Sequence, residues 1–170
     1  MGESGAKDGR APVGLADDDP HIEHGLPRRY CVEFGAWDGQ HLSNTAHLRL
    51  DHGWQGLLME GSNKADGQLV KREFVHAGNI NDLFARHGVP TDFELLPIDI
   101  DGNEYWVWEA LEGFTPRVVI IEYNVFFPID QACTIPYDPD WVWDRSYYHA
   151  ASIAAHQKLG RAKGYTLVYA

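Results

Sequence analysis

Residues 30–39 of the chain read Y-C-V-E-F-G-A-W-D-G, a short apolar run followed by a turn between Gly35 and Gly39. Residues 40–50, directly after this turn, can form a helix. In α/β folds, a strand that passes through glycines into a helix brings a ligand close to backbone N–H groups and to the helix N-terminus. Two glycines are a weak indication on their own, so the interpretation depends on the strands that follow.

Apolar, strand-like runs alternate with helix-like segments through the rest of the chain. Residues 117–123 form the strongest run, R-V-V-I-I-E-Y, whose unbroken β-branched character predicts a strand buried on both faces. The alternation predicts an α/β domain with a mainly parallel sheet. The other predicted strands are residues 55–61, 73–80, 93–100 and 165–170, and the other predicted helices are residues 81–87, 103–111 and 146–163.

The length and composition indicate one globular domain. The chain has 170 residues, of which 44% are hydrophobic and 23% are charged, a balance typical of folded proteins. Residues 1–20 are rich in Gly, Ala and Asp and lack periodicity, which predicts a mobile tail over residues 1–29 and a single domain over residues 30–170. No apolar run approaches the roughly 18 residues of a membrane span, so we expect a soluble, cytoplasmic protein without a membrane partner.

The charge of the chain narrows the class of partner. The formal net charge is −11, which argues against nucleic acid because phosphate binding needs clustered Lys and Arg. A neutral or cationic small molecule is compatible with this charge. Residues 124–148 form a long irregular stretch with many aromatic residues, which indicates either a functional loop over an aromatic substrate pocket or ordinary packing of aromatic rings.

Acidic residues stand at or near the ends of four predicted strands. In a parallel sheet these ends meet at one edge, where ligands bind. Glu60 follows the glycine turn by the interval at which an acid accepts hydrogen bonds from ribose hydroxyls, although it could also be a solvated strand end. Asp38, in the glycine turn, could likewise contact a ligand, or it could be an ordinary turn residue. The strand-end acids are Glu33, Glu60, Asp99, Asp101 and Glu122.

The glycine turn differs from a dinucleotide-binding fingerprint. It has no third glycine, and the bulky Trp37 leaves little room for a pyrophosphate. A ligand that carries a ribose but no phosphate, such as S-adenosylmethionine, suits this turn better. An oxidoreductase that uses a dinucleotide is therefore a disfavoured alternative.

Three segments together resemble the FkbM-type class I methyltransferases. They read V-E-F-G-A-W-D-G-Q-H-L-S, P-I-D-I-D-G-N-E and V-V-I-I-E-Y-N, and the resemblance covers about residues 30–170. Trp37 replaces the usual Asn of the first motif, and Asp101 replaces the usual Glu of the second. The positions that match the two motifs are Glu33, Gly35, Ala36, Gly39, Ser43, Asp99, Gly102 and Glu104.

The resemblance implies a Rossmann-like, three-layer α/β/α fold around a mainly parallel sheet. Such a fold ends with two further strands after its last long helix, whereas this chain reaches Ala170 after what reads as the first of them. We therefore expect a sheet that lacks the last strand. A homodimer could relieve the unpaired edge that this leaves.

The resemblance also implies a role for each motif residue. The turn over residues 35–39 would approach the methionine part of S-adenosylmethionine, with Ser43 near its carboxylate, Glu60 at the ribose and Asp99 beside the sulfonium. Asn81 and Asp82 would lie near the adenine. The implied cofactor-binding set is Glu33, Gly35, Ala36, Trp37, Asp38, Gly39, Ser43, Glu60, Asn81, Asp82 and Asp99.

Methyl transfer to an oxygen requires alignment of the reactants and removal of a proton. Asp99, Asp101 and Glu122 could remove it directly, or they could hold a divalent cation such as Mg²⁺. His149 is a further candidate base, with a partly exposed histidine at a helix start as its alternative interpretation. The candidate catalytic residues are Asp99, Asp101 and His149, and the candidate metal ligands are Asp99, Asp101 and Glu122.

The expected function is that of an S-adenosylmethionine-dependent methyltransferase acting on the oxygen of a small or glycosyl-type acceptor. The alternative is a methyltransferase-like domain that has lost its chemistry and acts as a binding module.

Overall fold

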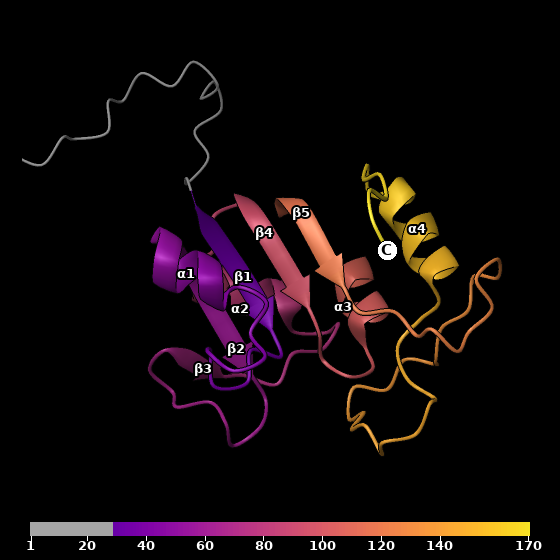
Figure 1. The fold of residues 1–170 in the computed structure, drawn as a ribbon, viewed down its shortest axis with the longest axis horizontal. Coiled ribbons are helices and arrows are strands. Elements are labelled where there is room, and N and C mark those ends of the chain that lie inside the picture. Colours follow the sequence, from indigo (N-terminus) through magenta and orange to yellow (C-terminus); the bar gives the residue numbers. More distant parts are fainter. Residues whose placement is uncertain (1–28) are drawn as a thin grey trace, which may run out of the picture.

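The structure, a computed structural model, describes residues 29–170 and contains one five-stranded, wholly parallel sheet (Figure 1). The strand order is β3-β2-β1-β4-β5, so the chain builds outward from β1 to β3 and then returns to the other side of β1. This reversal places a topological switch point between β1 and β4, where α/β sheets bind ligands. The strands are β1 (Tyr30–Phe34), β2 (Gln55–Glu60), β3 (Val70–Arg72), β4 (Asp92–Ile98) and β5 (Thr115–Ile121).

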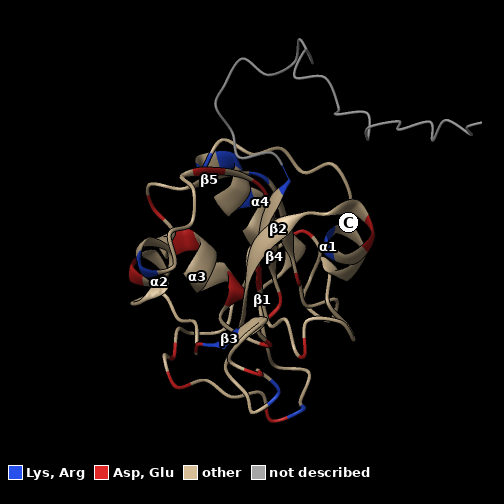
Figure 2. Ribbon diagram, turned by 90° about the vertical axis from the view of Figure 1, so that its left-hand side faces the viewer, with Lys and Arg blue, Asp and Glu red and all other residues tan. Residues whose placement is uncertain are grey.

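Helices cover both faces of the sheet, which confirms the expected α/β architecture. The helices are α1 (Ala46–His52), α2 (Ile80–Arg86), α3 (Glu104–Ala110) and α4 (Ile153–Ala162). In Figure 2, α2 and α3 lie on one side of the strands and α1 lies on the other. The main core fills the side of α2 and α3, where Phe34, Phe84 and Phe93 are fully buried. Helix α4 packs against α3, and its Leu159 joins the same core.

Two helices begin later than the sequence predicts. The helix predicted over residues 40–50 starts at Ala46, because the preceding residues form a loop that is hydrogen-bonded to Glu33 of β1. The helix predicted over residues 146–163 starts at Ile153. Ser152 is its N-cap, and the Ser152 side chain accepts a hydrogen bond from the backbone N–H of Ala155.

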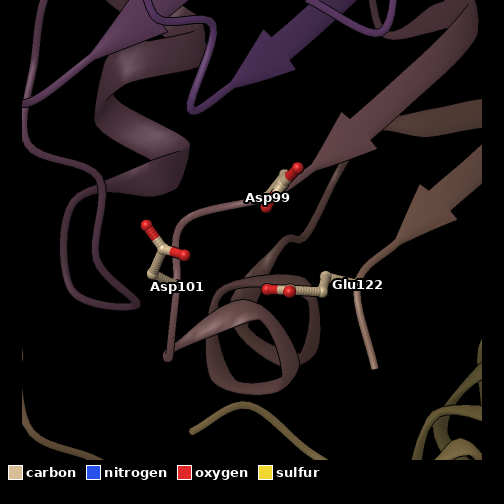
Figure 3. A group of neighbouring side chains, drawn as sticks. All are labelled: Asp99, Asp101 and Glu122. Atoms are coloured by element: carbon tan, nitrogen blue, oxygen red, sulfur yellow. The ribbon is translucent and has the colours of Figure 1, made fainter. Parts of the chain in front are cut away.

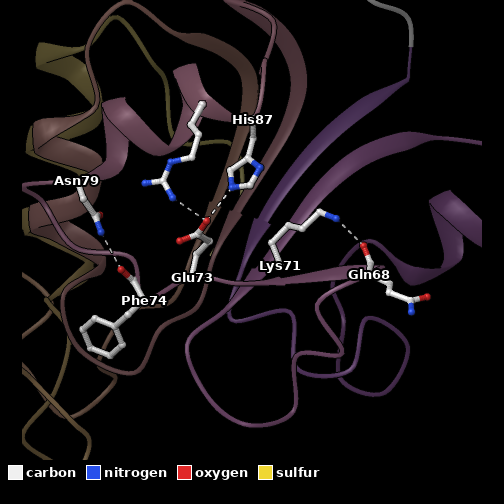
Figure 4. Close-up of polar contacts among 7 residues, drawn as sticks. Gln68, Lys71, Glu73, Phe74, Asn79 and His87 are labelled. Carbon is white, nitrogen blue, oxygen red and sulfur yellow. Dashed lines mark hydrogen bonds and ion pairs between the residues drawn. The ribbon is translucent and has the colours of Figure 1, made fainter.

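The third strand lies earlier in the chain than the sequence predicts. Strand β3 spans Val70–Arg72, before the predicted residues 73–80. The Asn79 side chain donates to the carbonyl of Phe74 (Figure 4). It also accepts from the N–H of His76, and the two hydrogen bonds curl this segment into a turn that leads into α2. The Glu73 carboxylate then pairs with Arg86 and His87 of the helix end.

The prediction that residues 117–123 are buried on both faces was wrong. Strand β5 lies at the edge of the sheet that the structure describes, and Val118 and Ile120 on one face are 45% and 46% exposed. Val119 on the other face packs on the core. The run has the β-branched character of a central strand but, within residues 29–170, β5 pairs with β4 alone and one of its faces stays half exposed.

The final predicted strand, residues 165–170, is not a strand in the structure. Tyr165 is anchored by its ring against Trp108 and by a hydrogen bond from its hydroxyl to the Pro116 carbonyl, and Val168 and Tyr169 beyond it are almost fully exposed. The predicted tail, apart from Arg29, lies outside the described residues. Over residues 29–170, no helix has the length and apolar character needed to cross a membrane.

Candidate functional site

A cavity of about 540 Å³ opens at the carboxyl ends of β1, β2 and β4. Its walls come from the turns after these strands, from the segment after β3, and from residues 141–143 of the long irregular stretch. The expected ligand edge of the sheet is therefore hollow. Among the residues predicted from sequence, the cavity is lined by Gly35, Trp37, Glu60, Asp99 and Asp101.

The turn after β1 lies in direct backbone contact with the turn after β4. Gly35 has a φ of 71°, and a Cβ atom at this position would lie 1.6 Å from the carbonyl oxygen of Asp99. Only glycine fits a position that combines this conformation with so close an approach. Trp37 also has a left-handed backbone, with a φ of 52°, which is uncommon for a bulky residue. At Trp37 the turn is thus held in a conformation that this residue does not favour.

Glu60 at the end of β2 holds the turn from the opposite wall. One carboxylate oxygen accepts a hydrogen bond from the Trp37 N–H at 3.2 Å, and the other accepts from the Ser62 N–H at 2.8 Å. These two backbone donors fix the orientation of the side chain at the cavity wall. Because each carboxylate oxygen has two lone pairs, Glu60 can still accept hydrogen bonds from ligand hydroxyls.

Glu33 lies behind the turn and does not line the cavity. Its fully buried carboxylate accepts hydrogen bonds from the Ser43 hydroxyl, the Asn44 N–H and the Thr45 hydroxyl, at 2.8, 2.6 and 2.5 Å. Arg49 donates to the same two hydroxyl oxygens. Glu33 and Ser43, which the resemblance placed at the cofactor, therefore support the loop from below.

Several other predicted cofactor residues also lie outside the cavity lining. Ala36 is buried in the small core on the α1 side, and Gly39 lies against Val70. The Asp38 carboxylate accepts hydrogen bonds from the backbone N–H groups of Gln40 and His41, within its own turn. Asn81 is turned toward α3, where its amide bridges the carbonyl of Ala110 and the N–H of Glu112. Its neighbour Asp82 is exposed on α2 and does not line the cavity.

Apolar walls complete the cavity, and sequence patterns did not identify them individually. Phe74 and Val75 come from the segment after β3, and Trp141 and Trp143 from the long irregular stretch. The aromatic content of residues 124–148 was the only sequence signal for the second pair. Phe74 was hidden inside a segment that reads as a strand.

Three carboxylates meet at the ends of β4 and β5 (Figure 3). Asp99, Asp101 and Glu122 each offer an oxygen atom, and these oxygens lie within 4.8 Å of one another. Asp101 has a left-handed backbone with a φ of 60°. The Trp141 indole N–H donates to the Asp101 carbonyl at 2.9 Å, and a Cβ atom at Gly102 would collide with the same ring at 2.2 Å.

The environment of these acids favours their neutral forms. Desolvation in the cleft and the charges of Asp101 and Glu33 raise the pKa of Asp99. Desolvation likewise raises the pKa of Asp101, against the opposing effect of His149. Burial, followed by the charges of Glu104, Asp99 and Asp101, raises the pKa of Glu122 to about 8. Acids with such raised pKa values, gathered in a cleft, are typical of functional sites.

His149 lies beside this cluster. Its ring is 5.9 Å from the ring of Trp143, and its backbone carbonyl accepts a hydrogen bond from the Asn124 side chain. Its Nδ1 atom is buried and has no hydrogen-bond partner within residues 29–170. Of the three candidate catalytic residues, Asp99 and Asp101 line the cavity, and His149 contacts Trp143 of its wall without lining it.

The charge of the lining is one-sided. Four carboxylates, those of Glu60, Glu73, Asp99 and Asp101, line the cavity, and no Lys or Arg does so among the described residues.

Comparisons of the chain with protein-family models, with curated proteins and with solved structures found no match. The chemistry of the cavity must therefore be inferred from its own residues. It suits a ligand that is cationic or rich in hydroxyl groups, and it disfavours phosphates.

Proposed function

We propose that the protein is an S-adenosylmethionine-dependent methyltransferase that methylates an oxygen of a small or glycosyl-type acceptor. The observation that carries this proposal is the acidic cavity at the switch point of a parallel sheet, which lacks a basic residue among its described lining. A pyrophosphate would leave its negative charges unpaired there. A ligand with a positive sulfonium and a neutral ribose would find complementary groups.

The residues of the cavity fit the parts of this cofactor. Glu60 would accept hydrogen bonds from the ribose hydroxyls, as acids at this position do in related sheets. Phe74 and Val75 offer an apolar wall for the adenine, and Asp99 offers a negative charge to the sulfonium. The backbone contact between Gly35 and the Asp99 carbonyl would keep these sites in a fixed relation.

The cofactor supplies a methyl group attached to a positively charged sulfur. In the transfer, the acceptor oxygen forms a bond to the methyl carbon while the carbon–sulfur bond breaks and its electron pair stays on sulfur. The proton of the acceptor hydroxyl then passes to a carboxylate of Asp99 or Asp101, or to the ring of His149. Residues 141–143 would cover the reacting groups and limit the access of water.

Calorimetric titration tests the proposal directly. We expect S-adenosylmethionine and its demethylated product to bind with micromolar affinity and ATP or NAD⁺ not to bind. Glu60→Ala should weaken binding at least tenfold, because two ribose hydroxyls lose their acceptor, about 1.4 kcal/mol or more. The matched control is Glu109→Gln, which changes an exposed acid on α3 and should bind as the parent protein does.

Two outcomes would separate the hypotheses. Absence of binding at micromolar levels would overturn the proposed function. Binding without turnover on a panel of hydroxylated acceptors, with Asp99→Asn equally silent, would favour the alternative, a binding module that has lost its chemistry.

A further inference from the structure

The three carboxylates of Asp99, Asp101 and Glu122 have the spacing of ligands to a single ion. A divalent cation with oxygen bonds of about 2.0–2.6 Å separates opposite ligands by about 4–5 Å. The three oxygens here lie within 4.8 Å of one another. They come from the turn after β4 and from the residue after β5, and these two strands pair side by side in the sheet (Figure 3).

A fourth carboxylate, buried beneath the cluster, provides an independent observation. Glu104 is fully buried, and one of its oxygens accepts hydrogen bonds from the N–H groups of Ile100 and Gly102, on either side of Asp101. The other oxygen, Oε2, is buried and has no partner among residues 29–170. The charge of Asp99 contributes to the raised pKa of Glu104, and the charge of Glu104 contributes to the raised pKa of Glu122, so this carboxylate lies close to both residues.

Glu122 repeats the pattern, because its Oε2 atom is also buried without a partner among the described residues. Buried carboxylate oxygens are ordinarily paired, since the loss of water without compensation costs several kcal/mol. Within the described chain, the cavity lining supplies no Lys or Arg to compensate these acids. A cation would compensate the buried carboxylate oxygens of Glu104 and Glu122 together with the more exposed Asp99 and Asp101.

The backbone presents Asp101 to the cluster at an energetic cost. Its left-handed conformation is stabilised by the hydrogen bond from Trp141 and by the space that Gly102 leaves for the indole ring. Strain of this kind persists where a side chain must point in a required direction.

We propose that Asp99, Asp101 and Glu122 bind one divalent cation of the Mg²⁺ or Mn²⁺ class, with Glu104 as the buried carboxylate that positions the turn and adds negative charge behind the ion. The binding site stands on its own geometry, and its role in transfer rests on the proposed function. There the ion would orient the acceptor oxygen and favour loss of its proton. The acceptor would therefore be one whose oxygen can enter the coordination sphere of the ion.

Titration of the EDTA-treated full chain with Mn²⁺, followed by electron paramagnetic resonance, tests the site. We expect one saturable site per chain from which Mg²⁺ displaces Mn²⁺. Asp101→Asn and Glu122→Gln should each abolish saturable binding, and Glu104→Gln should weaken it about tenfold or more because it acts behind the ligands. Asp130→Asn and Glu112→Gln change exposed acids elsewhere and should leave Mn²⁺ binding unchanged.

Circular dichroism and thermal unfolding must show that each variant is folded, so that lost binding is not lost structure. Absence of a saturable Mn²⁺ site in the parent protein, or equal binding by the Glu122→Gln variant, would overturn the proposal. Calorimetry with S-adenosylmethionine in EDTA separates this result from the proposed function. Mn²⁺ binding without cofactor binding would support the cation site and overturn the proposed methyltransferase function. Cofactor binding without a saturable Mn²⁺ site would overturn the cation site and leave the proposed function in place.

Discussion

The carbonyl oxygen of Asp99 occupies the space where a side chain of residue 35 would begin, 1.6 Å from the ideal Cβ position of Gly35. Strands β1 and β4 therefore touch through their backbones at the floor of the cavity. The contact sets the distance between the turn that contains Trp37 and the turn that contains Asp101.

Gly35→Ala should destabilise the protein beyond the usual cost of a left-handed alanine. That usual cost is about 1–2 kcal/mol and is measured by Gly88→Ala, since Gly88 has a φ of 64° but open space at its Cβ position. We expect the free energy of unfolding to fall by about 2 kcal/mol more in the Gly35 variant, in urea titrations at neutral pH. Equal losses in the two variants would show that the turns can separate freely.

Glu33→Gln should loosen the loop that follows β1. The glutamine amide keeps the shape of the carboxylate, but its NH₂ group cannot accept hydrogen bonds. The donors that surround residue 33 therefore lose one of their acceptor atoms. A buried donor without a partner costs about 1–3 kcal/mol, so the free energy of unfolding should fall by that amount. Glu109→Gln is the exposed control. If the Glu33→Gln variant kept the parental stability, contacts other than those of Glu33 would hold the loop.

Acid should destabilise the protein through His156. Burial lowers the pKa of this histidine from 6.5 to about 4, and the opposing effect of the Glu122 backbone is smaller. The unfolded chain therefore binds a proton that the folded chain does not, and stability falls as the pH drops from about 6.5 to 4, by up to about 3 kcal/mol. The difference in the free energy of unfolding between the parent and His156→Phe, followed from pH 7 to 4, isolates this contribution, because Glu104 and Glu122, which act in the opposite direction, are present in both proteins. A difference that stays constant with pH would exclude His156 as the source.

A rise in pH from about 4.5 to 8 should destabilise the metal-free protein through Glu104 and Glu122. Burial raises the pKa of Glu104 to about 7 and that of Glu122 to about 8, so the folded chain holds protons that the unfolded chain releases. Stability in EDTA should accordingly be full below about pH 4.5 for these two groups and should decline as the pH rises to about 8. Glu122→Gln should reduce the decline, as measured by thermal unfolding across this range. The control is Glu112→Gln, which should preserve it.

The convergence of the strand-end acids could be predicted because it follows from local information. A parallel sheet collects its carboxyl ends at one edge, and Glu60, Asp99 and Asp101 each follow a recognisable strand. Their arrival in one cavity needed no knowledge of side-chain packing.

The remaining errors arose where distant contacts decide the structure. Whether the run with Val118 and Ile120 is central or at an edge depends on which strand lies beside it, and the run itself does not contain that information. The orientation of Asn81 depends on carbonyl and N–H groups about thirty positions away. Glu104 was visible in its motif, but only its unpaired oxygen reveals that it belongs with the acids.

The hydrogen bond from Trp141 to the Asp101 carbonyl joins two segments forty positions apart in the chain. The same indole closes one wall of the cavity and braces the strained turn of an acid. A molecule that pushed this ring aside on entering would relax that turn and change the affinity of the acids for their ligand. Binding of a ligand against Trp141 and binding of a ligand to the acids would then be thermodynamically linked through this indole ring.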